Sequence, residues 1–297
     1  MLNRKITLVQ LILLLSMGVF ISCGGGKTDS NNDAAEFDAA KESLKENIEG
    51  VIINIPSPAE LPYLLQATGA DFNMALINSK ESADKYMSTF DKAAMNLGIY
   101  AADIGYLSSY EQTQEALDYL QVAKQLADHL GVVDAVDQVV LERFETNIDE
   151  KDSLYKIINS AIENVDQYLK TEARNRVAAL VTTGSFIEGL FVSTELVRTY
   201  PKDLLPDDAR NLILTPVIKI ILDQEKSVTE LIKLIESLPQ DELTIKINAD
   251  LVSLKENYAS LAMDDQIKNN RADLMLTDET LTDITATINK MRNDIIQ

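Results

Sequence analysis

The sequence predicts an all-α fold: a bundle of long antiparallel helices, roughly seven to nine of them, with no significant β-sheet. Apolar residues recur at alternating steps of three and four along most of the chain, which is the spacing of one face of an α-helix. Steps that average about 3.5 residues favour the shallow crossing angles of helical bundles. The strand-like stretch at residues 50–58 contains prolines that confine it to an extended linker.

The apolar stripes place the helices along the chain. Ser57, Pro58 and Glu60 form a helix start, with a capping serine, a proline in the first turn and a capping-box glutamate. Gly69 is well placed to end that helix. The stripes of the later helices cover residues 86–107, 116–130, 154–168, 177–191, 218–235, 243–261 and 281–295.

Four features interrupt these stripes. Gly131 directly follows the stripe at 116–130 and is expected to end that helix. Residues 200–207 contain two prolines and form the clearest break in the second half, where we expect a sub-boundary of the helical domain. Pro216 lies inside an apolar pattern and is expected to kink its helix. Residues 262–280 are polar and aperiodic, which predicts a loop before the last helix.

The N-terminal residues 1–22 have the pattern of an export signal. Arg4 and Lys5 come first, the apolar residues 6–21 follow, and the small Ser22 ends the segment. The apolar run is too short, and wrongly flanked, for a lasting membrane span. An N-terminal anchor helix is the alternative interpretation.

Cys23, the single cysteine of the chain, directly follows this signal. The stretch "FISC" at residues 20–23 resembles the lipobox of bacterial lipoproteins, in which the signal is cut before the cysteine and the thiol carries a diacylglycerol. Two or three acyl chains anchor a protein durably in a membrane. Residues 23–33 then form a flexible acylated tether, and residues 34–297 form the helical domain. Acylation of Cys23 leaves no thiol for a disulfide.

The charge of the chain argues against nucleic acid as a partner. Removal of residues 1–22 leaves 25 basic and 47 acidic residues, a net charge of −22. The field of such a chain repels nucleic acid and anionic lipid headgroups. An acidic surface also keeps a protein soluble, so the charge does not by itself indicate a cationic ligand.

The sequence offers no known catalytic, metal or cofactor motif. A di-iron bundle and a zincin each need at least two histidines, and His129 is the single histidine of the chain. Its place near a helix C-terminus suits a favourable interaction with the helix dipole. The stretch "GGGKT" is not a phosphate-binding loop, because Ile21 occupies the position of the first glycine. We therefore assign no catalytic residue, metal ligand or cofactor.

Glycines inside two predicted helices allow two interpretations. Gly98 and Gly105 share one helix, and Gly184 and Gly189 share another. A glycine in a helix costs about 1 kcal/mol relative to alanine, so something should offset that cost. One interpretation is close helix–helix packing, and the other is a ligand cleft.

The cleft interpretation names a set of aromatic and acidic side chains. The candidate ligand-binding residues are Tyr100, Asp103, Tyr106, Phe186 and Glu188, with Phe191 beside them. A half-buried carboxyl group there would have a raised pKa and could bind a cation or a polar ligand. It could equally form an ion pair with Arg143, Arg174, Arg176 or Arg198.

Two stretches, "SCGGGKTDSNND" and "NLGIYAADIGYLSSY", resemble uncharacterised helical lipoproteins of the Bacteroidetes outer-membrane kind. The resemblance implies a lipid-anchored protein of the outer membrane and brings no known activity. Lys27, Thr28 and Asp29 stand where surface-displayed members carry acidic residues, which leaves a periplasmic and a surface-facing location open. We expect a non-catalytic binding or scaffolding module with a protein partner in the envelope. The alternative is an envelope enzyme or small-ligand-binding protein that uses Asp103 and Glu188.

Overall fold

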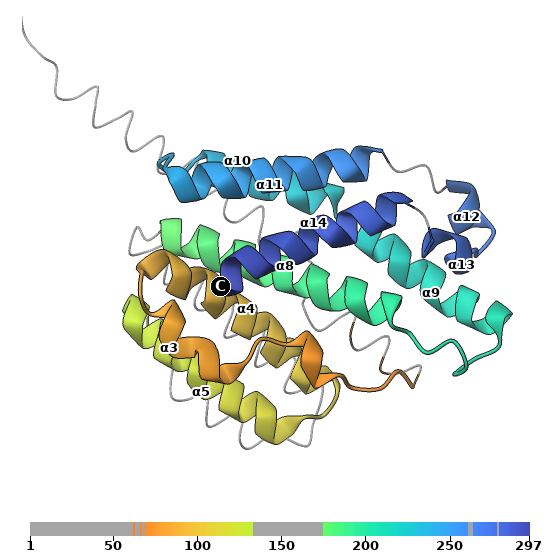
Figure 1. The fold of residues 1–297 in the computed structure, drawn as a ribbon, viewed down its shortest axis with the longest axis horizontal. Coiled ribbons are helices and arrows are strands. Elements are labelled where there is room, and N and C mark those ends of the chain that lie inside the picture. The colour runs from red at the N-terminus through yellow and green to blue at the C-terminus, as the bar shows by residue number, and fades with distance from the viewer. Residues whose placement is uncertain (1–61, 63–65, 67–68, 133–174, 261–263, 278) are drawn as a thin grey trace, which may run out of the picture. The chain divides into compact units, whose positions relative to one another are not determined.

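The computed structural model describes residues 62, 66, 69–132, 175–260, 264–277 and 279–297 (Figure 1). These residues form helices and connecting turns without a strand, so the fold is all-α, as predicted. The helices are η1 (Met74–Leu76), η2 (Lys80–Ser82), α3 (Ala83–Tyr86), α4 (Phe90–Ser109), α5 (Thr113–Leu130), α8 (Asn175–Arg198), α9 (Asp207–Leu222), α10 (Glu225–Glu236), α11 (Glu242–Ala259), α12 (Asp264–Lys268), α13 (Ala272–Met275) and α14 (Glu279–Ile296). The predicted signal and tether, Cys23, the linker at 50–58 and the stripe at 154–168 lie outside the described residues.

Helices α4 and α8 form the central pair, and two glycines let their backbones touch. A Cβ atom built on Gly98 would lie 2.0 Å from the carbonyl oxygen of Val181. A Cβ atom built on Gly184 would lie 2.0 Å from the carbonyl oxygen of Met95. Real side chains do not fit at such distances, which explains why glycine occupies both positions. Close packing is therefore confirmed at Gly98 and Gly184.

The central pair is parallel, which differs from the expected antiparallel arrangement. Asp91 near the start of α4 pairs with Arg176 near the start of α8 at 2.7 Å. Further along, Gly98 faces Val181, so the two helices advance in the same direction. The physical reason is that α5 returns the chain to the end at which α4 begins.

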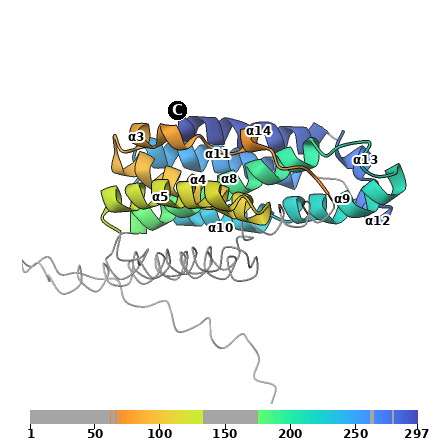
Figure 2. The ribbon, with the colours of Figure 1, turned by 90° about the horizontal axis from the view of Figure 1, so that it is seen from below.

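The other neighbours of the central pair run antiparallel to it or to each other. The rings of Tyr100 and Tyr119 lie 5.8 Å apart across α4 and α5. Helices α11 and α14 are linked by Lys246 and Asp294 at 2.5 Å and by Asp250 and Lys290 at 2.5 Å. In both views α9, α12 and α13 lie at the opposite end of the bundle from α3 and α5 (Figures 1 and 2).

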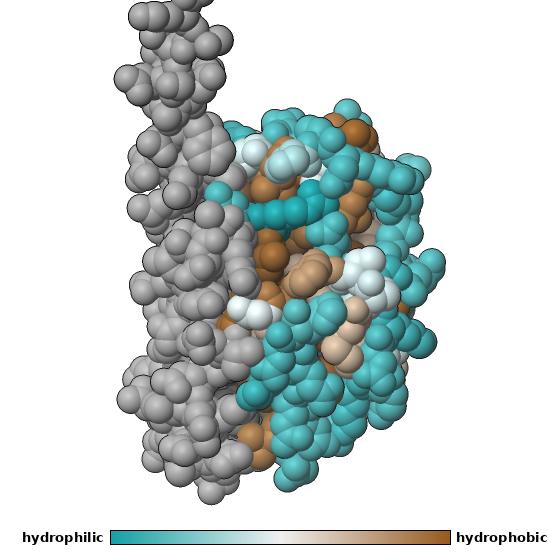
Figure 3. All heavy atoms as spheres, turned by 90° about the vertical axis from the view of Figure 1, so that its left-hand side faces the viewer, coloured by the Kyte–Doolittle hydropathy of each residue, from teal (hydrophilic) through white to brown (hydrophobic). Residues whose placement is uncertain are grey.

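Apolar side chains fill the space between these helices. Helix α8 contributes to the core along nearly its whole length, and α4 does the same from Ala93 to Leu107. Seen from the end that carries α3 and α5, hydrophilic residues form the outer surface and apolar residues are visible in a recess between them (Figure 3). The hydrophobic effect of this buried area is the main favourable contribution to folding.

Several predicted helix boundaries are confirmed. Gly131 ends α5 with a φ of +66°, a left-handed conformation that glycine adopts without strain. Gly69 has a φ of +88°, but most of the helix that it was predicted to end lies outside the described residues, so that boundary stays a prediction. Residues 200–207 connect α8 to α9, and two aspartates occupy the first turn of α9, where the helix dipole favours negative charge. Pro216 lies inside α9, and the helix continues through it.

Other boundaries were predicted wrongly. The stripe at 86–107 belongs to two helices, because Thr89 caps α4 by accepting a hydrogen bond from the Lys92 N–H at 3.2 Å. The stripe at 218–235 is likewise split into α9 and α10. The expected loop at 262–280 contains α12 and α13, and α13 buries Ala272 and Met275 in the core. Apolar spacing alone does not reveal a break of two or three residues.

Phe90 is also not a core residue, although it falls on the predicted stripe. It is the first residue of α4 and is 60% exposed. Its ring stacks on His129, with 5.3 Å between the ring centroids. His129 lies in the last turn of α5, as predicted.

Gly98→Ala should destabilise the protein strongly. Helix propensity alone would raise the free energy of unfolding by about 1 kcal/mol. The clash of the new methyl group with the backbone of α8 should instead lower it by about 3 kcal/mol, because backbone cannot move aside as a side chain can. Urea unfolding of the variant and the wild type measures the change in the free energy of unfolding. An equal or higher stability of the variant would contradict the close approach of α4 and α8.

Candidate functional site

The five residues of the predicted ligand site lie on the two central helices. Tyr100, Asp103 and Tyr106 come from α4, and Phe186 and Glu188 come from α8. All five lie in the core, where none is more than 2% exposed, and the electrostatic interactions link Tyr100 with Asp103 and Asp103 with Glu188. This geometry favours packing over an open cleft.

The hydroxyl groups of the two tyrosines are occupied by the chain's own backbone. Tyr100 donates a hydrogen bond to the carbonyl oxygen of Ser79 at 2.8 Å. The N–H of Asn73 donates to the Tyr106 hydroxyl oxygen, also at 2.8 Å. Burial raises the pKa of both tyrosines, so their hydroxyl groups stay neutral. These side chains therefore hold the irregular segment that precedes α3 against the central pair.

Glu188 forms a buried bidentate ion pair with Arg292 of α14. The Arg292 Nε donates to Glu188 Oε2 at 2.7 Å, and Nη2 donates to Oε1 at 2.8 Å. Burial raises the pKa of Glu188, and the charge of Arg292 opposes that rise. A bidentate guanidinium–carboxylate pair satisfies both oxygens at once and is among the strongest polar contacts in proteins.

Asp103 lies beside this pair, in surroundings that favour its protonated form. Burial, followed by the negative charge of Glu188, raises the pKa of Asp103 well above its ordinary value. Its Oδ2 accepts a hydrogen bond from the Asn78 N–H at 3.1 Å. Because Arg292 contacts Glu188 directly, the arginine favours the charged form of Glu188.

These three side chains, Asp103, Glu188 and Arg292, form what we call the buried charge cluster. Within this cluster, the positive charge of Arg292 pairs with Glu188. Arg292 also lies 4.0 Å from the centre of the Phe191 ring, a cation–π contact, and donates to the Leu76 carbonyl oxygen at 3.3 Å. Both oxygens of Glu188 are therefore engaged by Arg292. Across the described ranges, no group of three histidine, cysteine or acidic side chains is arranged to hold a metal ion.

The enzyme alternative required two carboxyl groups that face each other in a concave site. Asp103 and Glu188 do lie close together, since the charge of Glu188 contributes to the raised pKa of Asp103. Both are completely buried, however, and Arg292 of the same chain pairs with Glu188. The arrangement therefore serves the fold better than it could serve catalysis.

Sequence reasoning did not identify Arg292 as the partner of Glu188. Of the four arginines proposed, Arg176 pairs with Asp91 and Asp241, and Arg198 pairs with Glu195. Arg143 and Arg174 lie outside the described residues. The available signal was an arginine directly after Met291 in the apolar stripe of the last helix, which places a charge at the edge of a buried face.

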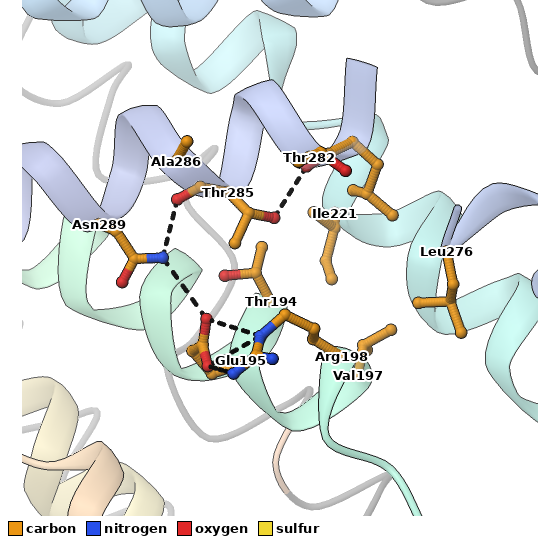
Figure 4. A pocket seen from close by; sticks show the side chains of 11 residues that line it. Thr194, Glu195, Val197, Arg198, Ile221, Leu276, Thr282, Thr285, Ala286 and Asn289 are labelled. Atoms are coloured by element: carbon orange, nitrogen blue, oxygen red, sulfur yellow. Dashed lines mark hydrogen bonds and ion pairs between the residues drawn. The ribbon is translucent and has the colours of Figure 1, made fainter. Parts of the chain in front are cut away.

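A cavity of about 380 Å³ lies elsewhere, between the C-terminal part of α8, the end of α9 and α14 (Figure 4). Glu195 and Arg198 of α8 and Asn289 of α14 provide polar groups in its wall. Figure 4 shows Val197 and Arg198 on one side of the open space and Leu276 across from them. None of the five predicted ligand-binding residues lines this cavity.

Comparisons with known proteins give no relative from which a function could be inferred. No protein-family model, curated protein or solved structure matches the chain. Of the helices that the structure describes, α8 alone is long and apolar enough to cross a bilayer, and 72% of that segment is buried inside the bundle. Core helices commonly meet the same criterion.

Arg292→Met should lower the free energy of unfolding by about 3–5 kcal/mol at neutral pH, because it leaves a buried charge on Glu188 unpaired. Burial raises the folded pKa of Glu188, so the folded variant takes up a proton as the pH falls and the loss becomes smaller in acid. Urea unfolding at pH 4 and pH 8 measures both effects. Lys290→Met is the matched control on the same helix, since its exposed ion pair with Asp250 contributes little. An equal loss of unfolding free energy in Arg292→Met and Lys290→Met would contradict the buried ion pair between Glu188 and Arg292.

Asp103→Asn should become more stable than the wild type as the pH rises. Above the ordinary aspartate pKa of 3.8 the unfolded wild type releases its proton, whereas the folded protein keeps it, so the wild type loses stability. The amide oxygen of asparagine can accept the same hydrogen bond from the Asn78 N–H, and the amide does not titrate. Unfolding midpoints between pH 4 and pH 8 test this trend. A variant that loses stability relative to the wild type over this range would mean that Asp103 is ionised in the fold.

Proposed function

We propose that the protein is a lipid-anchored component of the bacterial cell envelope that acts as a non-catalytic binding or scaffolding module. The anchor is supported by the order of the N-terminal residues, in which basic, apolar and small residues lead to Cys23. The Gly-rich, polar residues 24–33 would give the helical domain room to move relative to the membrane. The resemblance to outer-membrane lipoproteins supports that membrane as its location, facing either side.

The proposal of a non-catalytic role rests on the burial of the charge cluster, which a substrate cannot reach. A general acid or base must reach its substrate, directly or through one water molecule. Asp103 and Glu188 are completely buried, and their charges are balanced within the chain. The two residues on which an enzyme would depend are thus already used for folding.

Exposed apolar side chains support a protein partner. Leu212 of α9 is 58% exposed, and Leu274 of α13 is 45% exposed. The two helices are joined where the Asp273 N–H donates to the Asn211 side-chain oxygen at 3.0 Å. Large exposed apolar residues are common on surfaces, and where a partner covers them they contribute to binding. The net charge of −20 argues against nucleic acid as that partner.

Fractionation and pull-down from the native envelope test both parts of the proposal. The wild type should pellet with membranes, and Cys23→Ala should become soluble after cell lysis, because the variant lacks the acylated thiol. Crosslinking of the wild type should capture a stoichiometric protein partner. Asp103→Asn/Glu188→Gln is the control for the buried charge cluster, and it should capture the same partner.

Two outcomes would contradict the proposal. If the Cys23→Ala variant still associates with membranes, the proposed lipid anchor at Cys23 is contradicted. Wild-type protein without a partner, carrying a small molecule that the Asp103→Asn/Glu188→Gln variant has lost, would restore the ligand-binding or enzymatic alternative. Circular dichroism of the double variant, compared with the wild type, separates that result from simple unfolding.

A further inference from the structure

The cavity between α8, α9 and α14 has the size and the lining of a small-molecule site. Its volume of about 380 Å³ lies within the range of roughly 300–1,000 Å³ that is typical of such sites. Its apolar wall includes Val197, Ile221, Leu276 and Leu281 from four different segments. A wall assembled from several segments can enclose the body of a ligand better than one helix face can.

Most polar groups in the wall already have partners within the protein. The Thr194 hydroxyl donates to the Leu190 or Phe191 carbonyl oxygen of its own helix. The Thr285 hydroxyl donates to the Leu281 carbonyl oxygen at 2.8 Å. These two side chains therefore offer a ligand little polar recognition.

The Glu195 carboxylate is also fully used. Its Oε2 accepts hydrogen bonds from Arg198 Nε at 3.1 Å and from Nη2 at 2.6 Å. Its Oε1 accepts from Arg198 Nε at 3.2 Å and from Asn289 Nδ2 at 3.4 Å. A cationic ligand would have to displace one of these donors from a side chain that is only 11% exposed.

Arg198 differs from Thr194, Thr285 and Glu195 because, among the described residues, one edge of its guanidinium has no hydrogen-bond partner. Glu195 engages Nε and Nη2, and no described residue accepts a hydrogen bond from Nη1. The Arg198 side chain is 62% exposed, so this free edge can be reached from solvent. The paired carboxylate holds the planar group in one orientation, which reduces the entropy lost when an anion binds to it.

We propose that this cavity binds a small amphipathic organic anion, with its apolar body against Ile221, Leu276 and Leu281 and its carboxylate on the free edge of Arg198. The site is separate from the buried charge cluster and does not depend on the anchor at Cys23. The net charge of −20 repels anions at long range. A preference for an anionic head must therefore come from Arg198 itself.

Calorimetric titration of the folded protein with octanoate, octanol and octylammonium tests the proposal, because the three probes share one apolar body and differ in the charge of the head. Octanoate should bind at one saturable site, about tenfold tighter than octanol and tighter still than octylammonium. Arg198→Gln should remove this preference and weaken octanoate binding about tenfold. Arg271→Gln is the matched control, since Arg271 also pairs with a nearby aspartate but lies outside the cavity, and it should bind octanoate as the wild type does.

A second variant guards against unfolding caused by the loss of Arg198. Ala286 lies on the rim of the cavity on α14, and Ala286→Phe should fill the space without removing any core contact. This variant should keep the wild-type unfolding midpoint and lose octanoate binding. The proposal is overturned if octanoate does not bind saturably, if octylammonium binds as tightly, or if Arg271→Gln weakens binding as much as Arg198→Gln does.

Discussion

The contact between the backbones of α4 and α8 at Gly98 and Gly184 determines the arrangement of the rest of the core. Close contact between two helices fixes both their separation and their register, because any side chain at either glycine would force them apart. The parallel direction of the pair then places Asp103 and Glu188 at matching heights, five and four residues beyond the two glycines. Two acidic groups therefore meet inside the core as a consequence of the close approach.

The core can hold two carboxyl groups only if their charge is removed or balanced. Each isolated buried charge would cost several kcal/mol. Burial favours the protonated form of Asp103, and Glu188 pairs with Arg292, which α14 must deliver with its guanidinium in the correct plane. Slipping α14 by one residue along α8 would separate the pair, so the cluster permits a single register of the last helix. Hydrogen bonds from Tyr86 and Asn96 to the carbonyl oxygens of Ile296 and Ile295 fix the end of the same helix.

The sequence contains enough information for the helical fold and the break at 200–207, because both depend on residues close together in the chain. The glycines inside two helices also indicated close packing, although Gly98 and Gly184 lie far apart in the chain and no local spacing pairs them. The sequence correctly grouped Asp103 with Glu188, since both lie beside glycines on apolar helices. It could not show that α4 and α8 are parallel, because that direction depends on how the intervening chain returns. Arg292 was missed for the same kind of reason: it lies 104 residues from Glu188, and no local spacing connects them. The cavity depends on side chains from α8, α9 and α14 and on Leu276, which follows α13, and it has no signature in any one of these segments.

Glu188 and Glu195 lie seven residues apart on α8, and both point towards α14, where Arg292 and Asn289 meet them. The two glutamates differ in the exposure of the arginine with which each one pairs. Arg292 is 7% exposed, and its hydrogen bonds go to Glu188 and to the Leu76 carbonyl oxygen, so this pair is closed to any ligand. Arg198, at the end of α8, is exposed and keeps one edge open beside an apolar cavity. The same pairing of glutamate with arginine therefore stabilises the core at one turn of the helix and, two turns later, presents an oriented positive charge to solvent.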